Sequence, residues 1–174
     1  KIWAESLPGQ GTQFHLTLPY FNEMDYFRTE IKKTFEAISS KRTALGLINL
    51  VLHDLNRLDE PYRPTLFVEI EARIHAEALR RKSDKLYHKT PLEYVIVLPE
   101  TDLEGARGIA ERLRAQVEAL DIAHAPGEEI PVVTLSIGCA AAVPDDATSP
   151  AALLAAADGK LYEAKAQGRN RVRG

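Results

Sequence analysis

The sequence has little of what marks several large classes of protein. Its single cysteine, Cys139, cannot form a disulfide within the chain, and we expect a buried small side chain in a reducing compartment. No apolar run approaches the length needed to cross a bilayer. The net charge of −3 lacks the basic excess of a general nucleic-acid binder. These absences predict a soluble cytoplasmic protein with no nucleic-acid partner and no membrane contact of its own.

The 174 residues, 45% of them hydrophobic, suffice for one main domain and a small appendage. The main domain is organised around residues 81–101, where two short strands flank the tight connection 89–93. Val95 to Leu98 form a continuous apolar run rich in β-branched residues, which is typical of a buried central strand. Thr101 and Glu104 have the spacing of a capping box and predict the start of a helix.

Further elements follow from periodicity and capping residues. A first amphipathic helix over 22–40, which Asn22 can cap, has apolar residues at helical spacing: Phe27, Ile31, Phe35 and Ile38. The other expected elements are a strand over 43–55, helices over 65–80 and 103–120, a strand over 131–140, and a helix over 151–167 that Ser149 and Pro150 open and Gly168 ends. This order, βαββαβ, predicts an α+β, ferredoxin-like sheet with helices on one face.

Residues 1–20 alternate apolar and polar side chains on both sides of a Pro-Gly-Gln-Gly turn, which predicts a β-hairpin. The segment IWAESLPGQGTQF also resembles the end of the ATP-binding domain of sensor histidine kinases. The resemblance implies an upstream histidine kinase core in the same chain. Nucleotide contact by Gly11 and Thr12 would need the rest of that domain. We therefore divide the chain into this tail, 1–20, packed against but not woven into a domain over 21–174.

Several segments of the main domain resemble one known family. They are LPET at 98–101, AERLR at 110–114, VTLSIG at 133–138, and the C-terminal pattern of Ala157-Asp158, Leu161-Tyr162, Ala164-Lys165 and Gly168-Arg169-Asn170. Together they resemble the GGDEF family, bacterial diguanylate cyclases that condense two molecules of GTP into cyclic di-GMP. The resemblance covers residues 21–174.

The name-giving motif of that family is degenerate here, because the chain has Thr90-Pro91-Leu92-Glu93-Tyr94 in its place. The family's two metal-binding carboxylates align with Val51 and Leu92. Apolar side chains cannot bind Mg²⁺, which needs hard oxygen ligands. Thr90 and Pro91 replace the glycines that admit the phosphates. The resemblance therefore predicts no catalytic residues, no bound metal and no cofactor, so that the domain is not an active cyclase.

Each of the other polar residues near these positions has two interpretations. His53, Asp54, Asp59 and Glu60 could bind a metal, but a charged loop after a strand is more often only solvated. Glu93 keeps an acid of the signature, although a turn or sheet-edge role is the simpler interpretation. Lys165 and Arg169 match the family's triphosphate-contacting residues. They could equally dock the last helix to the sheet.

One ligand site of the family is retained in full. The family's inhibitory site for cyclic di-GMP is an Arg-x-x-Asp motif that an arginine on the next helix completes, and these residues correspond to Arg81, Asp84 and Arg112. Arginine forks suit guanine edges and phosphate, while a carboxylate accepts from guanine N–H groups. The alternative is a solvated turn in which Ser83 or Asp84 caps the backbone.

The resemblance thus predicts a non-catalytic cyclic di-GMP receptor that regulates a linked histidine kinase within a bacterial two-component system. A dimer is expected as well, since the family's ligand can bridge two domains. Two alternatives stay open: a ligand-free dimerisation or docking module, and, with the least support, an active diguanylate cyclase.

Overall fold

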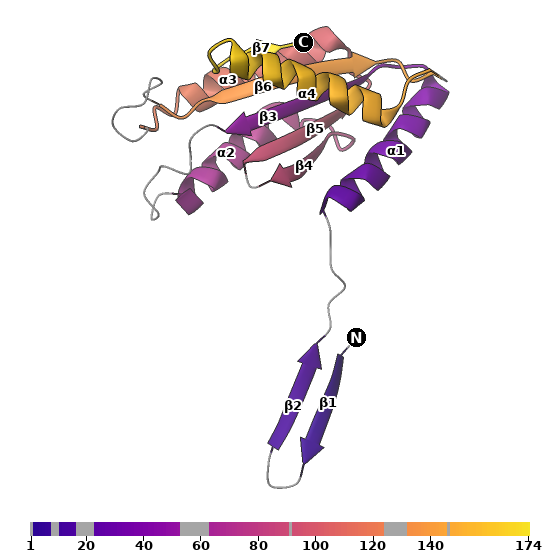
Figure 1. The fold of residues 1–174 in the computed structure, drawn as a ribbon, viewed down its shortest axis with the longest axis vertical. Helices are drawn as coiled ribbons and strands as arrows, with labels where there is room; N and C mark the ends of the chain where they lie inside the picture. Colours follow the sequence, from indigo (N-terminus) through magenta and orange to yellow (C-terminus); the bar gives the residue numbers. More distant parts are fainter. Residues whose placement is uncertain are drawn as a thin grey trace.

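The computed structural model describes residues 2–7, 11–16, 23–52, 63–90, 92–123, 132–145 and 147–174 (Figure 1). In chain order the elements are β1 Ile2–Leu7, β2 Gly11–Leu16, α1 Glu23–Lys41, β3 Leu45–Leu52, α2 Arg63–Ala78, β4 Lys85–Thr90, β5 Glu93–Pro99, α3 Leu103–Glu118, β6 Leu135–Ala142, α4 Pro150–Ala166 and β7 Val172–Arg173. The predicted order βαββαβ is confirmed from β3 to β6.

Five strands form one mixed sheet in the order β4-β5-β3-β6-β7. β3 lies at the centre and pairs antiparallel with β5 on one side and β6 on the other. The short β7 pairs with β6 in parallel, so the basic end of the chain is part of the sheet. The predicted buried run is confirmed, because Val95 to Leu98 are each at most 1% exposed.

Helices cover both faces of this sheet, and the expectation of helices on one face is wrong. One apolar cluster joins the sheet to α2 and α3, and the other joins it to α1 and α4. Alternate residues of β3 enter the two clusters: Ile48 and Leu50 face α2 and α3, whereas Leu45 and Leu47 face α1 and α4. A strand that is buried on both faces has a continuous apolar sequence, which is the pattern that LGLINLVL has.

The ends of the helices agree with the sequence except at α3. Ser149 caps α4 by accepting from the amide of Ala152, with Pro150 in the first turn. At α3 the capping side chain is Asp102, which accepts from the amide of Gly105 at 2.8 Å. The predicted cap, Thr101, is instead buried and donates to the carbonyl of Pro99. The cap proposed at Asn22 lies outside the described residues.

Strands β1 and β2 form the predicted hairpin as a two-stranded antiparallel sheet of their own. Figure 1 draws the hairpin as a unit of its own, and its packing against the domain stays a prediction. Two separate sheets result, and β1 and β2 are not woven into the larger one.

Helix α1 belongs to the main domain because its apolar face is buried there. Phe27, Ile31, Phe35 and Ile38 are all buried, as their spacing predicted. The ring of Phe27 lies 4.9 Å from that of Tyr87 on β4. Glu23, the first residue of the helix, accepts a hydrogen bond from the backbone amide of His88 at 3.0 Å. The helix is therefore joined to the outer strand of the sheet.

Among the described residues, no helix combines the length and the apolar composition needed to span a membrane. The one cysteine is buried on β6, as predicted, and its burial raises the pKa of the Cys139 thiol to about 12.

Candidate functional site

The Arg-x-x-Asp motif forms the turn between α2 and β4. The amide of Asp84 donates to the carbonyl of Arg81 at 3.0 Å, and the amide of Arg81 donates to Asp84 Oδ2 at 2.8 Å. Each residue thus bonds the backbone of the other. The role expected for Asp84 in the alternative interpretation, that of capping a turn, is present in the structure for one carboxylate oxygen.

The other carboxylate oxygen of Asp84 has no hydrogen-bond partner among the described residues. Asp84 is 8% exposed, and Oδ1 itself is buried. Leaving a buried polar atom unpaired costs about 1–3 kcal/mol, and more when the group is charged. A carboxylate oxygen in this state is therefore a strong acceptor for any donor that reaches it.

The guanidinium of Arg81 is held against the end of β5. Nη1 donates to the carbonyl of Pro99 at 3.1 Å, and Nη2 donates to Thr101 Oγ1 at 3.3 Å. A guanidinium has five N–H donors, so these two bonds orient the group and leave about three donors for other partners. Pro99 and Thr101 were not predicted as members of this site, because their roles depend on the packing of α2 against β5.

The third predicted residue, Arg112, lies on α3 beside the end of α2. Its Nε contacts Glu77 Oε2 at 3.3 Å. Glu77 also accepts from Arg80 and Gln116, and the side chain of Arg112 remains 49% exposed. Arg80 directly precedes Arg81. The structure therefore connects Arg112 to the segment that carries the motif, although no direct contact joins Arg112 to Arg81 or Asp84.

At the other end of β4 lies the turn over 90–94, called the signature turn because the resemblance aligns it with the name-giving motif of the family. Val51 pairs with Glu93, and the amide of Leu52 donates to the carbonyl of Leu92 at 3.0 Å. The two positions that align with the family's metal carboxylates are thus neighbours, and both carry apolar side chains. Thr90 Oγ1 accepts from the amides of Leu92 and Glu93, which closes the turn.

Two ion pairs join helix α4 to the hairpin of β4 and β5 that carries the signature turn. Lys165 lies 3.7 Å from Glu93, and Lys89 lies 2.9 Å from Asp158. The first of these ion pairs joins α4 to β5, and both interpretations of Lys165 stay predictions. Asp158 also accepts from Asn49, which is fully buried on β3 and whose Oδ1 has no partner in the described part of the chain.

Sequence reasoning missed the group formed by Asn49, Lys89 and Asp158. The one available signal was Asn49, the single polar side chain in the apolar run of β3. Its partner, Asp158, lies 109 positions away on α4, and Lys89 of β4 pairs with the same carboxylate, so the group forms only when α4 packs on the sheet.

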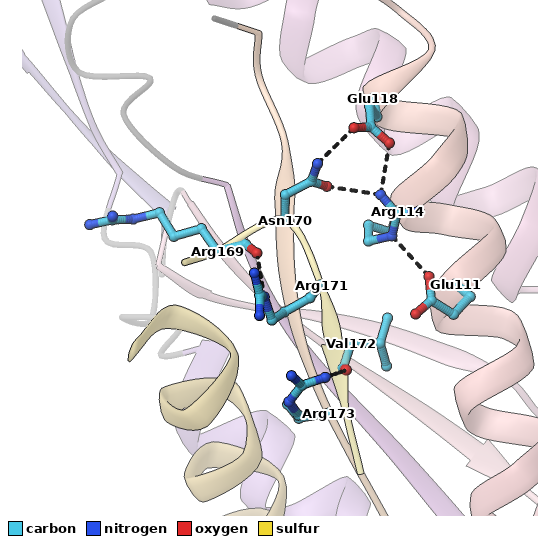
Figure 2. Close-up of polar contacts among 8 residues, drawn as sticks. All are labelled: Glu111, Arg114, Glu118, Arg169, Asn170, Arg171, Val172 and Arg173. Carbon is cyan, nitrogen blue, oxygen red and sulfur yellow. Dashed lines mark hydrogen bonds and ion pairs between the residues drawn. The ribbon is translucent and has the colours of Figure 1, made fainter. Parts of the chain in front are cut away.

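In the turn that follows α4, the side chain of Arg169 points away from α3 (Figure 2). Asn170 anchors this turn to α3, because it donates to Glu118 at 2.7 Å and accepts from Arg114 at 3.0 Å. The bonds from Asn170 and Arg114 hold the pKa of Glu118 below its usual value. Arg169 is exposed, and its guanidinium contacts none of the residues drawn around it. Its backbone has a φ of 57°, in the left-handed region.

Metal ligation has no support in the described ranges. No group of three or more His, Cys, Asp or Glu side chains there is placed to hold a metal ion. The cluster proposed with least support, His53, Asp54, Asp59 and Glu60, lies outside the described residues.

The mixed sheet in this strand order, with two helices on each face, is the fold of solved GGDEF domains. Residues 21–171 match the family model described as "Diguanylate cyclase, GGDEF domain", so the chain belongs to the GGDEF family.

Three proteins illustrate the similarity. The GGDEF domain of DgcB from Caulobacter crescentus, solved in complex with c-di-GMP, has a TM-score of 0.74 at 18% identity over 91% of this chain and 98% of that one. Response regulator PleD of Caulobacter vibrioides is 45% identical over 47% of this chain and 18% of PleD. Diguanylate cyclase A of Treponema denticola is 29% identical over 84% of this chain and 40% of the relative. The chain spans less than half the length of both relatives.

Proposed function

We propose that the domain over 21–174 is a cyclic di-GMP receptor rather than a cyclase, and that Arg81, Asp84 and Arg112 bind the ligand. The observation that carries the proposal is the buried, unpartnered Oδ1 of Asp84 in a turn that also presents Arg81. The DgcB domain, which shares the fold, was solved with c-di-GMP bound.

The chemistry of the three side chains matches the ligand. Guanine N1 and N2 carry donors that suit a carboxylate oxygen without a partner, and the buried position of Oδ1 means that Asp84 must turn outward to meet them. Arg81 keeps about three N–H donors for guanine O6 and N7. Arg112 is half exposed and can meet a phosphate, in competition with Glu77.

The signature hairpin supports a non-catalytic role. Phosphoryl transfer between nucleotides requires metal-bound phosphates, and Val51 and Leu92 offer no oxygen ligand. Lys165, which aligns with a triphosphate contact of the family, is paired with Glu93. Cyclic di-GMP can bind without these groups, whereas GTP in a cyclase cannot react without them.

The receptor acts within a larger protein in this proposal. The hairpin of β1 and β2 is the end of a histidine kinase ATP-binding domain, and α1 connects that domain to the receptor. Ligand binding at one end of β4 reaches α1 through its contacts with Tyr87 and the amide of His88. The kinase activity then depends on the concentration of cyclic di-GMP, and a bridging ligand promotes a homodimer.

Isothermal titration calorimetry with cyclic di-GMP tests the proposal. Arg81→Ala removes charge-assisted hydrogen bonds worth about 1.5–3 kcal/mol, which predicts a roughly tenfold to hundredfold loss of affinity. Lys82→Ala is the matched control, since it removes a positive charge from the same exposed turn and should leave the affinity unchanged. GTP should bind more weakly than cyclic di-GMP.

Absence of heat, and of thermal stabilisation, on adding cyclic di-GMP to the wild-type protein would contradict the proposal. The docking module would then be the remaining function. Equal losses in the two variants would instead indicate attraction between charges without a specific site.

A further inference from the structure

A pocket of about 510 Å³ lies between α1 and the first half of α4, on the face of the sheet opposite α2 and α3. Phe27 and Ile31 of α1 line it from the core side, and both are nearly inaccessible to water. On the α4 side it is lined by the small or aliphatic side chains of Ala151, Leu154 and Ala155. Its volume lies in the range of small-molecule sites.

The pocket has two rows of side chains along α1 with different chemistry. Phe27 and Ile31, four residues apart, form the apolar row. Arg28 and Lys32, each the next residue along, form a cationic row that also lines the pocket. Arg28 has a solvent-exposed ion pair with Asp25 at 3.3 Å, and Lys32 is exposed on the same helix. Both cations are therefore available to a ligand.

The one acidic side chain in the lining, Asp158, is already neutralised. It lies 2.9 Å from Lys89 and accepts a hydrogen bond from Asn49. The net charge that faces the pocket is therefore positive, next to an apolar interior. This combination favours a ligand with an apolar body and a single anionic group, and disfavours a cationic or zwitterionic one.

We propose that this pocket binds an amphipathic carboxylate, a medium-length acyl chain with an anionic head. The acyl chain packs on Ala151, Leu154 and Ala155, above the buried Phe27 and Ile31, and the carboxylate meets Lys32 and Arg28. The site is separate from Arg81, Asp84 and Arg112, and its occupation does not depend on cyclic di-GMP. Because it lies between α1 and α4, a bound chain would brace α1 against the domain.

Nuclear magnetic resonance titration of the whole 174-residue chain with decanoate, below its micelle concentration, tests the proposal. We expect saturable shifts centred on the amides of Ala151 and Ala155. Decyltrimethylammonium and decanol carry the same chain with a cationic or neutral head, and both should bind at least about tenfold more weakly, which is the effect of losing one charge-assisted contact.

Charge reversals on one helix separate a specific contact from general attraction. Lys32→Glu should weaken decanoate binding by about tenfold or more. Lys33→Glu is the matched control: Lys33 is exposed on α1, pairs with Glu30 and does not line the pocket, so its reversal should change the affinity less than about twofold. Ala155→Trp should fill the pocket from an exposed position and abolish binding.

Three results would overturn the proposal: no saturable shift with decanoate, equal binding of the cationic probe, or equal effects of the two lysine reversals. Sedimentation of the wild-type chain and of Ala155→Trp tests whether a second copy of the chain occupies the pocket instead. If the wild-type chain self-associates, the variant does not, and decanoate causes no shift, then the pocket is an interface between two copies of the chain.

Discussion

The two ends of strand β4 differ in how their charged side chains are paired. At the end that carries the signature turn, Lys89 is paired with Asp158 and the following Glu93 with Lys165. At the start of the strand, Asp84 uses one oxygen within its own turn, and the other has no hydrogen-bond partner in the described part of the chain. Arg81 there retains about three free donors.

A residue that matches the family motif is not necessarily available to a ligand. Lys165 matches the family motif at the signature end, yet the chain itself supplies the anion beside it. Asp84 also matches its motif, but the chain satisfies only half of its carboxylate. The proposal therefore places ligand binding where the fold leaves a polar group incompletely paired.

The largest expected effect concerns catalysis at the signature end. The wild-type protein with GTP and Mg²⁺ or Mn²⁺ should form no cyclic di-GMP, because Val51 and Leu92 supply no metal ligand. Replacing residues 90–92 with Gly-Gly-Asp should not restore activity while Val51 remains apolar. Chromatography of the nucleotides after prolonged incubation is the measurement. Cyclic di-GMP above the level of the blank without enzyme would show that the signature end of β4 is catalytic and would contradict the prediction.

The next effect tests how α4 is held over the signature hairpin. A Cβ at Gly138 of β6 would lie 2.2 Å from the carbonyl oxygen of Ala157 and from the amide nitrogen of Leu161. Gly138→Ala must therefore push α4 off the sheet, and we expect the free energy of unfolding to fall by about 3 kcal/mol. Urea denaturation is the measurement.

Gly159→Ala on the same helix is the control for Gly138→Ala. No atom lies within 4 Å of the added Cβ, and alanine in a helix is more favourable than glycine, so this variant should be more stable by about 0.5–1 kcal/mol. Destabilisation of similar size in both variants would show that close contact with β6 is not the cause.

A smaller effect separates the two roles of Asp84. Asp84→Asn keeps a side-chain oxygen that can accept from the amide of Arg81, so the free energy of unfolding should change by less than about 1 kcal/mol. The loss of the carboxylate should still weaken cyclic di-GMP binding by about tenfold. Calorimetry and urea denaturation of the same samples measure both. A stable variant with wild-type affinity would limit Asp84 to capping the turn.

The smallest effect is a pH dependence away from both ends of β4. The folded pKa of Glu118 lies below its ordinary value of 4.5 because Asn170 and Arg114 donate to it. A lowered folded pKa stabilises the protein above about pH 4.5, and that contribution is lost as the pH falls below it.

The free energy of unfolding of the wild type should fall between pH 6 and pH 3.5, and in Glu118→Gln this fall should be smaller. The difference should be less than about 1 kcal/mol, because the side chain of Glu118 is 42% exposed. Glu36→Gln, an exposed change on α1, should leave the slope of the wild type. If the two variants have the same slope, the bonds to Glu118 do not contribute.

Local sequence patterns predicted most of the fold. The spacing of Phe27 and Ile31, the cap at Ser149 and the run from Val95 to Leu98 each depend on neighbours within a few residues. The helices on both faces were missed although β3 and β5 carry continuous apolar runs, because the motif order was given more weight than this signal. At α3, Thr101 and Asp102 both had capping chemistry, and the burial of Thr101 decided between them.

The residues of the candidate site follow from motif spacing and stay a prediction, whereas their hydrogen bonds could not be predicted. The motif spacing identified Arg81, Asp84 and Arg112. The partners of Arg81 on β5, the hydrogen bonds to Glu77 and the group around Asp158 join segments that meet only after the sheet and helices have packed. Sequence spacing carries no information on such contacts.

The hydrogen bond from the amide of His88 to Glu23 also bears on solubility. β4 is the outermost strand of the sheet, and the unpaired amides of an outer strand are a template on which another chain can add a strand. The carboxylate of Glu23 occupies one of these donors, and Phe27 of the same helix covers Tyr87. A fragment that begins at β3 would lose both contacts, and we expect it to aggregate more readily than the longer chain.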